Sequence, residues 1–157
     1  MTYVFDTNSL SNVLNHYYRG RFPSFWEKLD EMIKKRRIVS VREARFELES
    51  RFDKAVIEQL KTHNPDFFED PTAKELSFIT EIYSVPHFRQ NLDRKKLLQG
   101  GYFADPFIIA KAKVKEGWVI TEEDKPEHGA RIPNICEHFK IECLKLEGFL
   151  VKEDWKF

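Results

Sequence analysis

The chain has 157 residues, the usual size of one domain and enough to bury a substantial core. Its 26 Lys and Arg residues balance its 26 Asp and Glu residues, so the chain lacks the basic excess typical of nucleic-acid-binding proteins. No apolar stretch approaches the roughly 20 residues of a transmembrane helix, and the N-terminus does not resemble a signal peptide. We therefore expect a single domain over residues 1–157, located in the cytoplasm and without a membrane partner.

Strand-like and helix-like segments alternate in the first part of the chain. Residues 2–6 are expected to form a short buried strand, followed by a helix over about 8–16. Pro23 begins an amphipathic helix whose apolar residues share one face. The β-branched residues of segment 36–41 predict a second strand, and another helix follows it directly.

The alternation continues in the second part of the chain. Residues 54–98 are expected to be helical, with breaks at three prolines, because proline ends helices. The later expected elements are a helix over 106–116, a strand over 118–121, a short helix over 133–139 and a strand over 141–144. Strands that alternate with helices favour a parallel sheet covered on both faces. The sequence therefore predicts an α/β fold.

Four acidic residues lie where an apolar segment gives way to a helix or a loop. They are Asp6 in YVFDTNSL, Glu47 in IVSVREARFELE, Asp105 in GYFADPFIIAKA and Glu123 in WVITEEDKP. The carboxyl ends of parallel strands share one crevice, so these carboxylates are expected to lie close together. Hard divalent cations prefer oxygen ligands, and the pattern therefore predicts a divalent-metal site.

Each of these acids also has a simpler structural explanation. Asp6 and Asp105 both fit the pattern of helix N-caps. Glu47 lies on the flank of its helix and could face solvent, while Glu123 lies in a run of three acids that is typical of an exposed loop. Glu43, one turn before Glu47, is expected to point away from the interior.

Asp105 has the strongest positional argument among the four acids. Ile108, Ile109 and Ala112 follow it at helical spacing, so its carboxylate is expected to project over the buried face of the helix. A desolvated carboxylate needs a partner. Because no Lys or Arg is expected beside it, a metal cation is the predicted partner.

Taken together, these segments resemble a PIN domain over essentially the whole chain. The resemblance rests on the DTNS opening, the helical Glu47, the ADPFIIAKA segment and the strand that ends in Thr-x-acid. Within that family the chain is most similar to the VapC-like toxin ribonucleases, and particularly to a PIN-like branch that ends in an IPNICEHF-type motif. The acid two residues after the Thr is commonly Asp in PIN nucleases. Here it is Glu123, flanked by Glu122 and Asp124, and any of the three could be the fourth acid.

The resemblance implies a PIN-like three-layer α/β/α sandwich with a central parallel sheet of about four to five strands. It also implies a metal-dependent endoribonuclease that hydrolyses RNA phosphodiester bonds with Mg²⁺ or Mn²⁺. Asp6 and Asp105 would be the principal metal ligands, Glu47 a ligand or a water-orienting base, and Glu123 a ligand or an outer acid. The same resemblance implies a toxin of a type II toxin-antitoxin system, with an antitoxin protein as partner and a possible homodimer.

Further residues are expected around this site. Asn8 and Thr121 would orient a carboxylate or the phosphate. Contact with RNA would come from basic residues around the crevice, and the candidates are Arg42, Arg45 and the basic cluster over residues 89–96.

Three other functions stay open at this point. An aspartyl phosphatase or phosphotransferase generally needs a second Asp two residues after the first, and Asn8 occupies that position. A catalytically degenerate PIN-like module would bind RNA or protein without cleaving it, and the presence of Glu123 in place of Asp favours this alternative. A PIN-type DNA nuclease would be recognised by its preference for structured DNA over single-stranded RNA.

Overall fold

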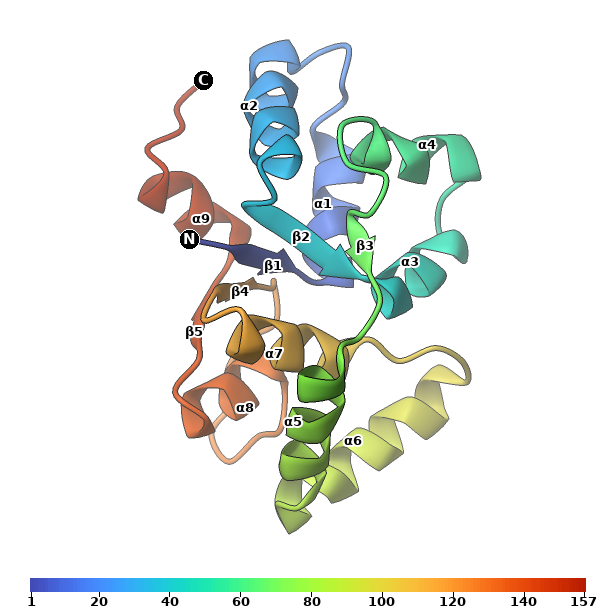
Figure 1. Ribbon diagram of the computed structural model, residues 1–157, viewed down its shortest axis with the longest axis vertical. Helices are drawn as coiled ribbons and strands as arrows, with labels where there is room; N and C mark the ends of the chain where they lie inside the picture. The colour runs from blue at the N-terminus through green and yellow to red at the C-terminus, as the bar shows by residue number, and fades with distance from the viewer.

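The computed structural model describes residues 1–157 and contains a central five-stranded sheet flanked by helices (Figure 1). Its strand order is β3-β2-β1-β4-β5, and all four neighbouring pairs are parallel. The strands are β1 (Tyr3–Phe5), β2 (Ile38–Val41), β3 (Phe68–Glu69), β4 (Trp118–Ile120) and β5 (Glu142–Leu144). The predicted α/β fold with a central parallel sheet is therefore confirmed.

Nine α-helices and one short 3₁₀ turn (Gln59–Lys61) connect and cover these strands. The helices are α1 (Thr7–His16), α2 (Pro23–Lys34), α3 (Arg42–Glu49), α4 (Lys54–Glu58), α5 (Ala73–Tyr83), α6 (Pro86–Gln99), α7 (Asp105–Val114), α8 (Ile132–His138) and α9 (Leu146–Lys152). Two elements, β3 and α9, were not predicted from the sequence. None of the helices combines the length and apolar character required to cross a membrane.

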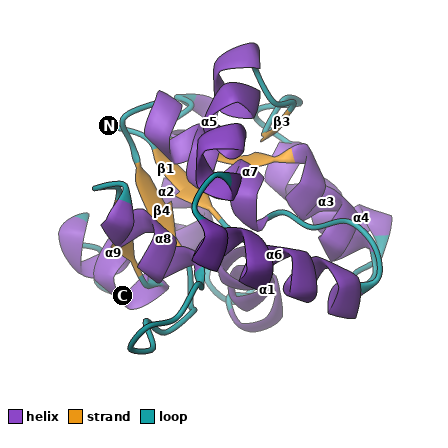
Figure 2. Cartoon of the chain, turned by 90° about the horizontal axis from the view of Figure 1, so that it is seen from below, coloured by secondary structure: helices purple, strands orange, loops and turns teal.

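The sheet lies between two apolar layers, because successive side chains of a strand point to opposite faces. Tyr3 and Phe5 of β1 belong to one cluster of 19 buried residues, and Val4 between them belongs to a second cluster of the same size. Helices α1, α2, α4 and α9 contribute to the first cluster, and α5, α6, α7 and α8 contribute to the second. The two groups of helices lie on opposite sides of the sheet, which gives three layers (Figures 1 and 2).

The register of the central strands brings their carboxyl ends to one edge of the sheet. Phe5, the last residue of β1, is aligned with Ile120, the last residue of β4. The residues that follow these strands, Asp6 and Thr121, therefore emerge side by side. Helix α3 begins at Arg42, directly after β2, so its first turns lie at the same edge.

A buried ion-pair cluster joins α7 to α5 and to β3, the strand at one edge of the sheet. The Lys111 side chain is only 1% exposed, and its Nζ lies 3.0 Å from Glu69 Oε1 and 2.8 Å from Glu75 Oε1. Burial alone would raise the pKa of Glu75, but the charge and hydrogen bond of Lys111 hold this pKa below its ordinary value. Lys111 therefore holds α7 to β3 and α5 through its charge, a role that no sequence pattern had indicated.

Candidate functional site

Asp6 is a helix N-cap and also contacts the end of a neighbouring strand. It is the N-cap of α1, and its Oδ1 accepts a hydrogen bond from the Ser9 backbone N–H at 2.8 Å. Its Oδ2 accepts a hydrogen bond from the Thr121 hydroxyl, which comes from the adjacent strand end. Asp6 is 3% exposed, and this burial raises its pKa to about 6 even though both hydrogen bonds oppose the shift. The negative charge of Glu123 adds to the increase.

Asp105 is the first residue of α7 rather than its N-cap, a position that Ala104 occupies. Burial raises the pKa of the Asp105 carboxyl to about 7. The expectation that no basic residue lies beside it is wrong, because Lys95 Nζ lies 2.5 Å from Asp105 Oδ2. Lys95 is on α6, and the packing of α6 rather than local sequence brings the two together. The charge and hydrogen bond of Lys95 lower this pKa, whereas the negative charges of Glu123 and Glu47 raise it.

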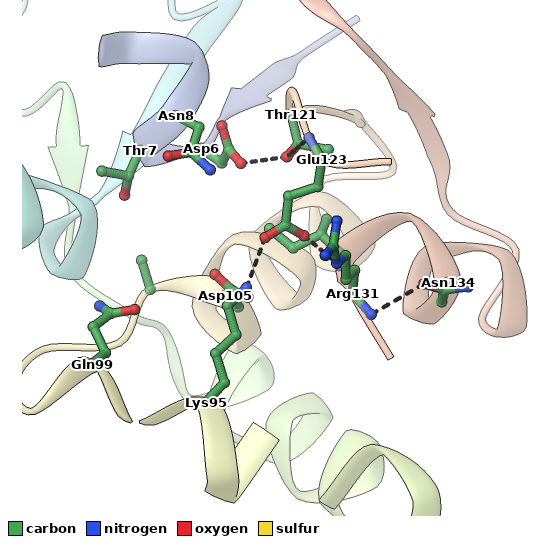
Figure 3. A network of polar contacts seen from close by, with 12 residues as sticks. Asp6, Thr7, Asn8, Lys95, Gln99, Asp105, Thr121, Glu123, Arg131 and Asn134 are labelled. Carbon is green, nitrogen blue, oxygen red and sulfur yellow. Dashed lines mark hydrogen bonds and ion pairs between the residues drawn. The ribbon is translucent and has the colours of Figure 1, made fainter. Parts of the chain in front are cut away.

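Glu123 faces Asp105 across the ammonium group of Lys95 (Figure 3). Its Oε1 lies 2.7 Å from Lys95 Nζ, and its Oε2 accepts a hydrogen bond from the Ile132 backbone N–H at 2.9 Å. Lys95 thus bridges two acids from different elements, Asp105 of α7 and Glu123 of the loop after β4. One oxygen of Glu123 is fixed by the backbone at the start of α8, and the other is directed towards the cation.

The two acids on either side of Glu123 have structural contacts elsewhere. Glu122 accepts a hydrogen bond from the Leu146 backbone N–H at 2.7 Å, at the N-terminus of α9. Asp124 forms an ion pair of 2.6 Å with Lys145. Among the three acids that the sequence could not separate, Glu123 is therefore the one directed towards Asp105.

Glu47 also lies beside Asp105, but both of its oxygens are engaged. Its Oε1 accepts a hydrogen bond from the Thr7 hydroxyl. Its Oε2 accepts hydrogen bonds from the Ala104 backbone N–H at 3.1 Å and from the Gln99 side-chain amide. Glu47 thereby joins α3 to α1 and to the segment that precedes α7. Through its hydrogen bond with Ala104, Glu47 holds the backbone just before α7 in place.

The expectation that Glu43 points away from the interior is wrong. Glu43 is buried; its Oε1 pairs with Arg42 at 3.0 Å, and its Oε2 has no hydrogen-bond partner. Residues four apart in a helix differ by only about 40° around its axis, so Glu43 lies on the same side of α3 as Glu47. The sequence argument placed the two on different sides, which their spacing does not allow.

The two predicted orienting residues behave differently. The Thr121 hydroxyl donates to Asp6 and accepts from the Glu123 backbone N–H at 3.2 Å, so it links two of the acids. Asn8 is exposed, and its Oδ1 lies 3.4 Å from Arg51 Nη1 rather than beside an acid. The preceding residue, Thr7, contacts an acid instead of Asn8: its hydroxyl donates a hydrogen bond to Glu47.

An open crevice of about 590 Å³ adjoins Glu123 and Lys95 but is not lined by Asp6, Glu47 or Asp105, and no hydrophobic residue lines it. Its lining residues are Asn8, Ser11, Asn12, Arg51, Lys95, Glu122, Glu123, Asp124 and Arg131. Of the basic residues predicted to contact RNA, Lys95 from the 89–96 cluster lines this crevice. Arg42 and Arg45 do not line it and form ion pairs with acids of α3, β3, α4 and their flanks.

Two arginines that were not predicted complete the rim of the crevice. Arg51 donates to Ser11 Oγ at 3.1 Å and follows Glu47 by four residues, a spacing that could have identified it. Arg131 is the N-cap of α8, and Figure 3 shows it beside Glu123. No sequence signal distinguishes Arg131 from other surface arginines.

The donor atoms at this site suit a hard divalent cation, since all are carboxylate or hydroxyl oxygens. Two of the carboxylates are buried, and both carry pKa values raised by burial and by neighbouring negative charge. No three carboxylate, imidazole or thiol side chains in the structure lie close enough together to hold a metal. The cation position between Asp105 and Glu123 is instead taken by the ammonium group of Lys95.

These features define an α/β protein with an acidic, basic-rimmed crevice at the carboxyl edge of a parallel sheet. The chain belongs to the family described as Domain of unknown function (DUF4411), whose model matches residues 3–157. No curated protein and no solved structure matches the chain. The fold is compatible with a PIN domain, but no PIN family model matches the chain, so that resemblance stays a prediction.

The raised pKa of Asp6 predicts a specific pH dependence of stability. Because the pKa is about 6 in the folded protein against an ordinary value of 3.8, the folded state binds more protons between these values. The contribution of this group to the free energy of unfolding is therefore greatest below pH 4 and is lost as the pH rises through 6. The loss amounts to about 1.4 kcal/mol for each pH unit between the two pKa values.

Urea denaturation of the wild type and of Asp6→Asn between pH 4 and pH 8 measures this effect. Asn can cap α1 and can donate to Thr121, so the variant removes the charge with little change in shape. We expect the stability of Asp6→Asn relative to wild type to increase as the pH rises. Parallel stability curves for the two proteins would show that Asp6 titrates normally.

Proposed function

We propose that this protein is a divalent-metal-dependent endoribonuclease that hydrolyses RNA phosphodiester bonds. The observation that carries the proposal is that Asp105 and Glu123 share the Lys95 ammonium group at the carboxyl edge of the sheet, where Asp6 and Glu47 also lie. Asp6 and Asp105 are each more than nine-tenths buried. Burying two acids near two others is costly, and such costs are typical of functional sites. The resemblance to VapC-like PIN toxins supports the same function.

Asp6, Asp105 and Glu123 would hold Mg²⁺ or Mn²⁺ after their side chains move closer together, because no three acids form a metal-binding group in the structure. A bound ion of this kind supplies an activated water and neutralises charge on the scissile phosphate. Glu47 would fix the start of α7 and, with it, the position of Asp105, because Glu47 accepts the N–H of Ala104. Thr121 would orient Asp6, because its hydroxyl donates a hydrogen bond to that carboxylate. It would also orient Glu123, because the same hydroxyl accepts a hydrogen bond from the Glu123 backbone N–H.

The rim of the crevice supports a polyanionic substrate. Arg51 and Arg131 both line the opening, and neither forms an ion pair in the structure. Arginine binds phosphate through a planar fork of donors, which positions a nucleic-acid backbone without reading its sequence. Because contacts of arginine with phosphate are electrostatic, binding should weaken with added salt.

The same resemblance supports a biological context for the proposed nuclease. In that context the protein is the toxin of a type II toxin-antitoxin system, and its partner is a cognate antitoxin protein that covers the crevice. A homodimer is the proposed assembly. Inducible expression of wild type and of Asp6→Ala in bacteria tests toxicity, and sedimentation of the purified chain tests the dimer.

A second candidate function is supported by the contacts of Lys95. Its ammonium group already neutralises Asp105 and Glu123, so the crevice can be electrically balanced without a metal. A PIN-like module of this kind would bind RNA or protein without cleavage. The two functions differ in whether a divalent cation binds to the acids at all.

Cleavage of end-labelled single-stranded RNA by the purified protein tests the proposal. We expect cleavage with Mn²⁺ or Mg²⁺ and none with excess EDTA, because the carboxylates alone provide no activated water. Structured DNA of the same length serves as the comparison substrate. RNA binding without cleavage in any divalent metal would favour the binding module, and preferential cleavage of the DNA would identify a DNA nuclease.

A further inference from the structure

The Lys95 ammonium group is paired with the carboxylate oxygens that a metal ion would need. Its Nζ lies 2.5 Å from Asp105 Oδ2 and 2.7 Å from Glu123 Oε1. The second oxygen of Glu123 is held by the Ile132 backbone N–H at 2.9 Å, so Oε1 is the oxygen of Glu123 that is available to a cation. A divalent ion binds carboxylate oxygens at about 2.0–2.2 Å. An ammonium group and a divalent ion cannot both occupy this small space between the same two oxygens.

The Lys95 side chain has a route out of this position. It is 38% exposed, and it lines the open crevice of about 590 Å³. Its four-carbon stem is flexible, and its ammonium group is readily hydrated. The ammonium can therefore withdraw into the crevice while the backbone of α6 stays in place.

Lys111 shows what a fixed lysine looks like in the same protein. It also bridges two carboxylates, those of Glu69 and Glu75, but its side chain is 1% exposed and lines no opening. Release of Lys111 would require α7 to separate from β3 and α5. Lys95 differs in that a solvent-filled space adjoins its ammonium group.

We propose that Lys95 is a tethered cation that competes with the divalent metal for Asp105 and Glu123 and is displaced into the crevice when the metal binds. The displaced ammonium would then lie in the crevice with Arg51 and Arg131, where the RNA phosphates are proposed to bind. Lys95 is in this sense a positioning residue of the site. The inference rests on the proposed metal-dependent function.

Calorimetric titration of Mn²⁺ into wild type, Lys95→Met and Lys96→Met tests the competition. Lys96 is exposed on the same helix and forms no ion pair, so Lys96→Met is the matched control. We expect Lys95→Met to bind Mn²⁺ roughly tenfold more tightly than wild type or more, and Lys96→Met to bind like wild type. Lys95→Arg retains the charge and should keep the weak binding.

The possible results separate this proposal from the proposed function. Equal Mn²⁺ affinity in wild type and Lys95→Met would overturn the competition and leave the metal site intact. Absence of binding in both proteins would overturn the competition together with the metal-dependent function. Mn²⁺ binding that is tighter in Lys95→Met than in wild type, and unchanged in Lys96→Met, supports both the competition and the metal-dependent function.

A second measurement uses the wild-type protein and does not depend on the folding of a variant. Lysine side chains are acetylated with a water-soluble reagent, with and without saturating Mg²⁺, and the modified sites are quantified by mass spectrometry. We expect Mg²⁺ to increase the labelling of Lys95 several-fold and to leave Lys96 unchanged. Unchanged labelling of Lys95 in protein that binds Mg²⁺ would overturn the proposal.

Discussion

Asp6→Asn and Asp105→Asn are each expected to lower metal-dependent RNA cleavage by about 100-fold or more, because each removes a charged oxygen ligand from the buried pair. Both residues are buried and both have raised pKa values, as expected for acids held in place for a cation. The measurement is the initial rate of cleavage of a labelled RNA at saturating Mn²⁺.

The control for this prediction is Asp93→Asn. Asp93 is exposed on α6 and does not line the crevice, so its variant should cleave RNA at the wild-type rate. Circular dichroism and thermal unfolding establish that all three variants are folded. Undiminished cleavage by Asp6→Asn and Asp105→Asn would place the nuclease chemistry elsewhere or attribute it to a contaminant.

Replacing Lys111 by Met is expected to destabilise the protein by about 3–5 kcal/mol, because it leaves the buried carboxylate of Glu75 without its cation, whereas Glu69 keeps Lys115 at 3.4 Å. Glu75 is 2% exposed, so its carboxylate cannot easily reach solvent. Urea denaturation at pH 7 measures the loss as a lower transition midpoint at an unchanged slope. Lys113→Met on the same helix removes an exposed lysine and should change stability by less than about 0.5 kcal/mol.

A compensating variant separates the charge effect from the packing effect. Lys111→Met combined with Glu69→Gln and Glu75→Gln no longer contains the unpaired charges. It should recover a large part of the lost stability, since an uncharged buried cluster can be as stable as an ion pair. Failure to recover any stability would indicate that the packing of the lysine stem, rather than its charge, supports α7.

Four of the five strands were predictable because each is a short apolar run flanked by polar residues. β3 has only two residues, Phe68 and Glu69, so it presents no periodicity and was included in a long helical region. It forms its strand pairs only because β2 offers a free edge. This is a tertiary effect that local patterns do not contain. Helix α9 contains Gly148, which weakens a helical pattern, and it was likewise not predicted.

The placement of the acids was predictable to a similar extent. Asp6 was identified because it directly follows the apolar segment that forms β1. No strand precedes Asp105, which was identified because it begins a helix with a buried face. Lys95 was not identified as the partner of Asp105, because that contact depends on how α6 packs against the rest of the chain. Arg131 reaches the crevice through the long loop after β4, which has no regular pattern.

The central claim is that the acids at the carboxyl edge of the sheet form a divalent-cation site. Thermal unfolding of wild type and Asp6→Asn, with and without Mn²⁺, tests it most directly. A ligand at 100 times its Kd stabilises the folded state by about 2.7 kcal/mol, which gives a measurable rise in Tm. We predict that Mn²⁺ raises the Tm of the wild type and leaves that of Asp6→Asn nearly unchanged. No shift in the wild type, or an equal shift in both proteins, would contradict the claim.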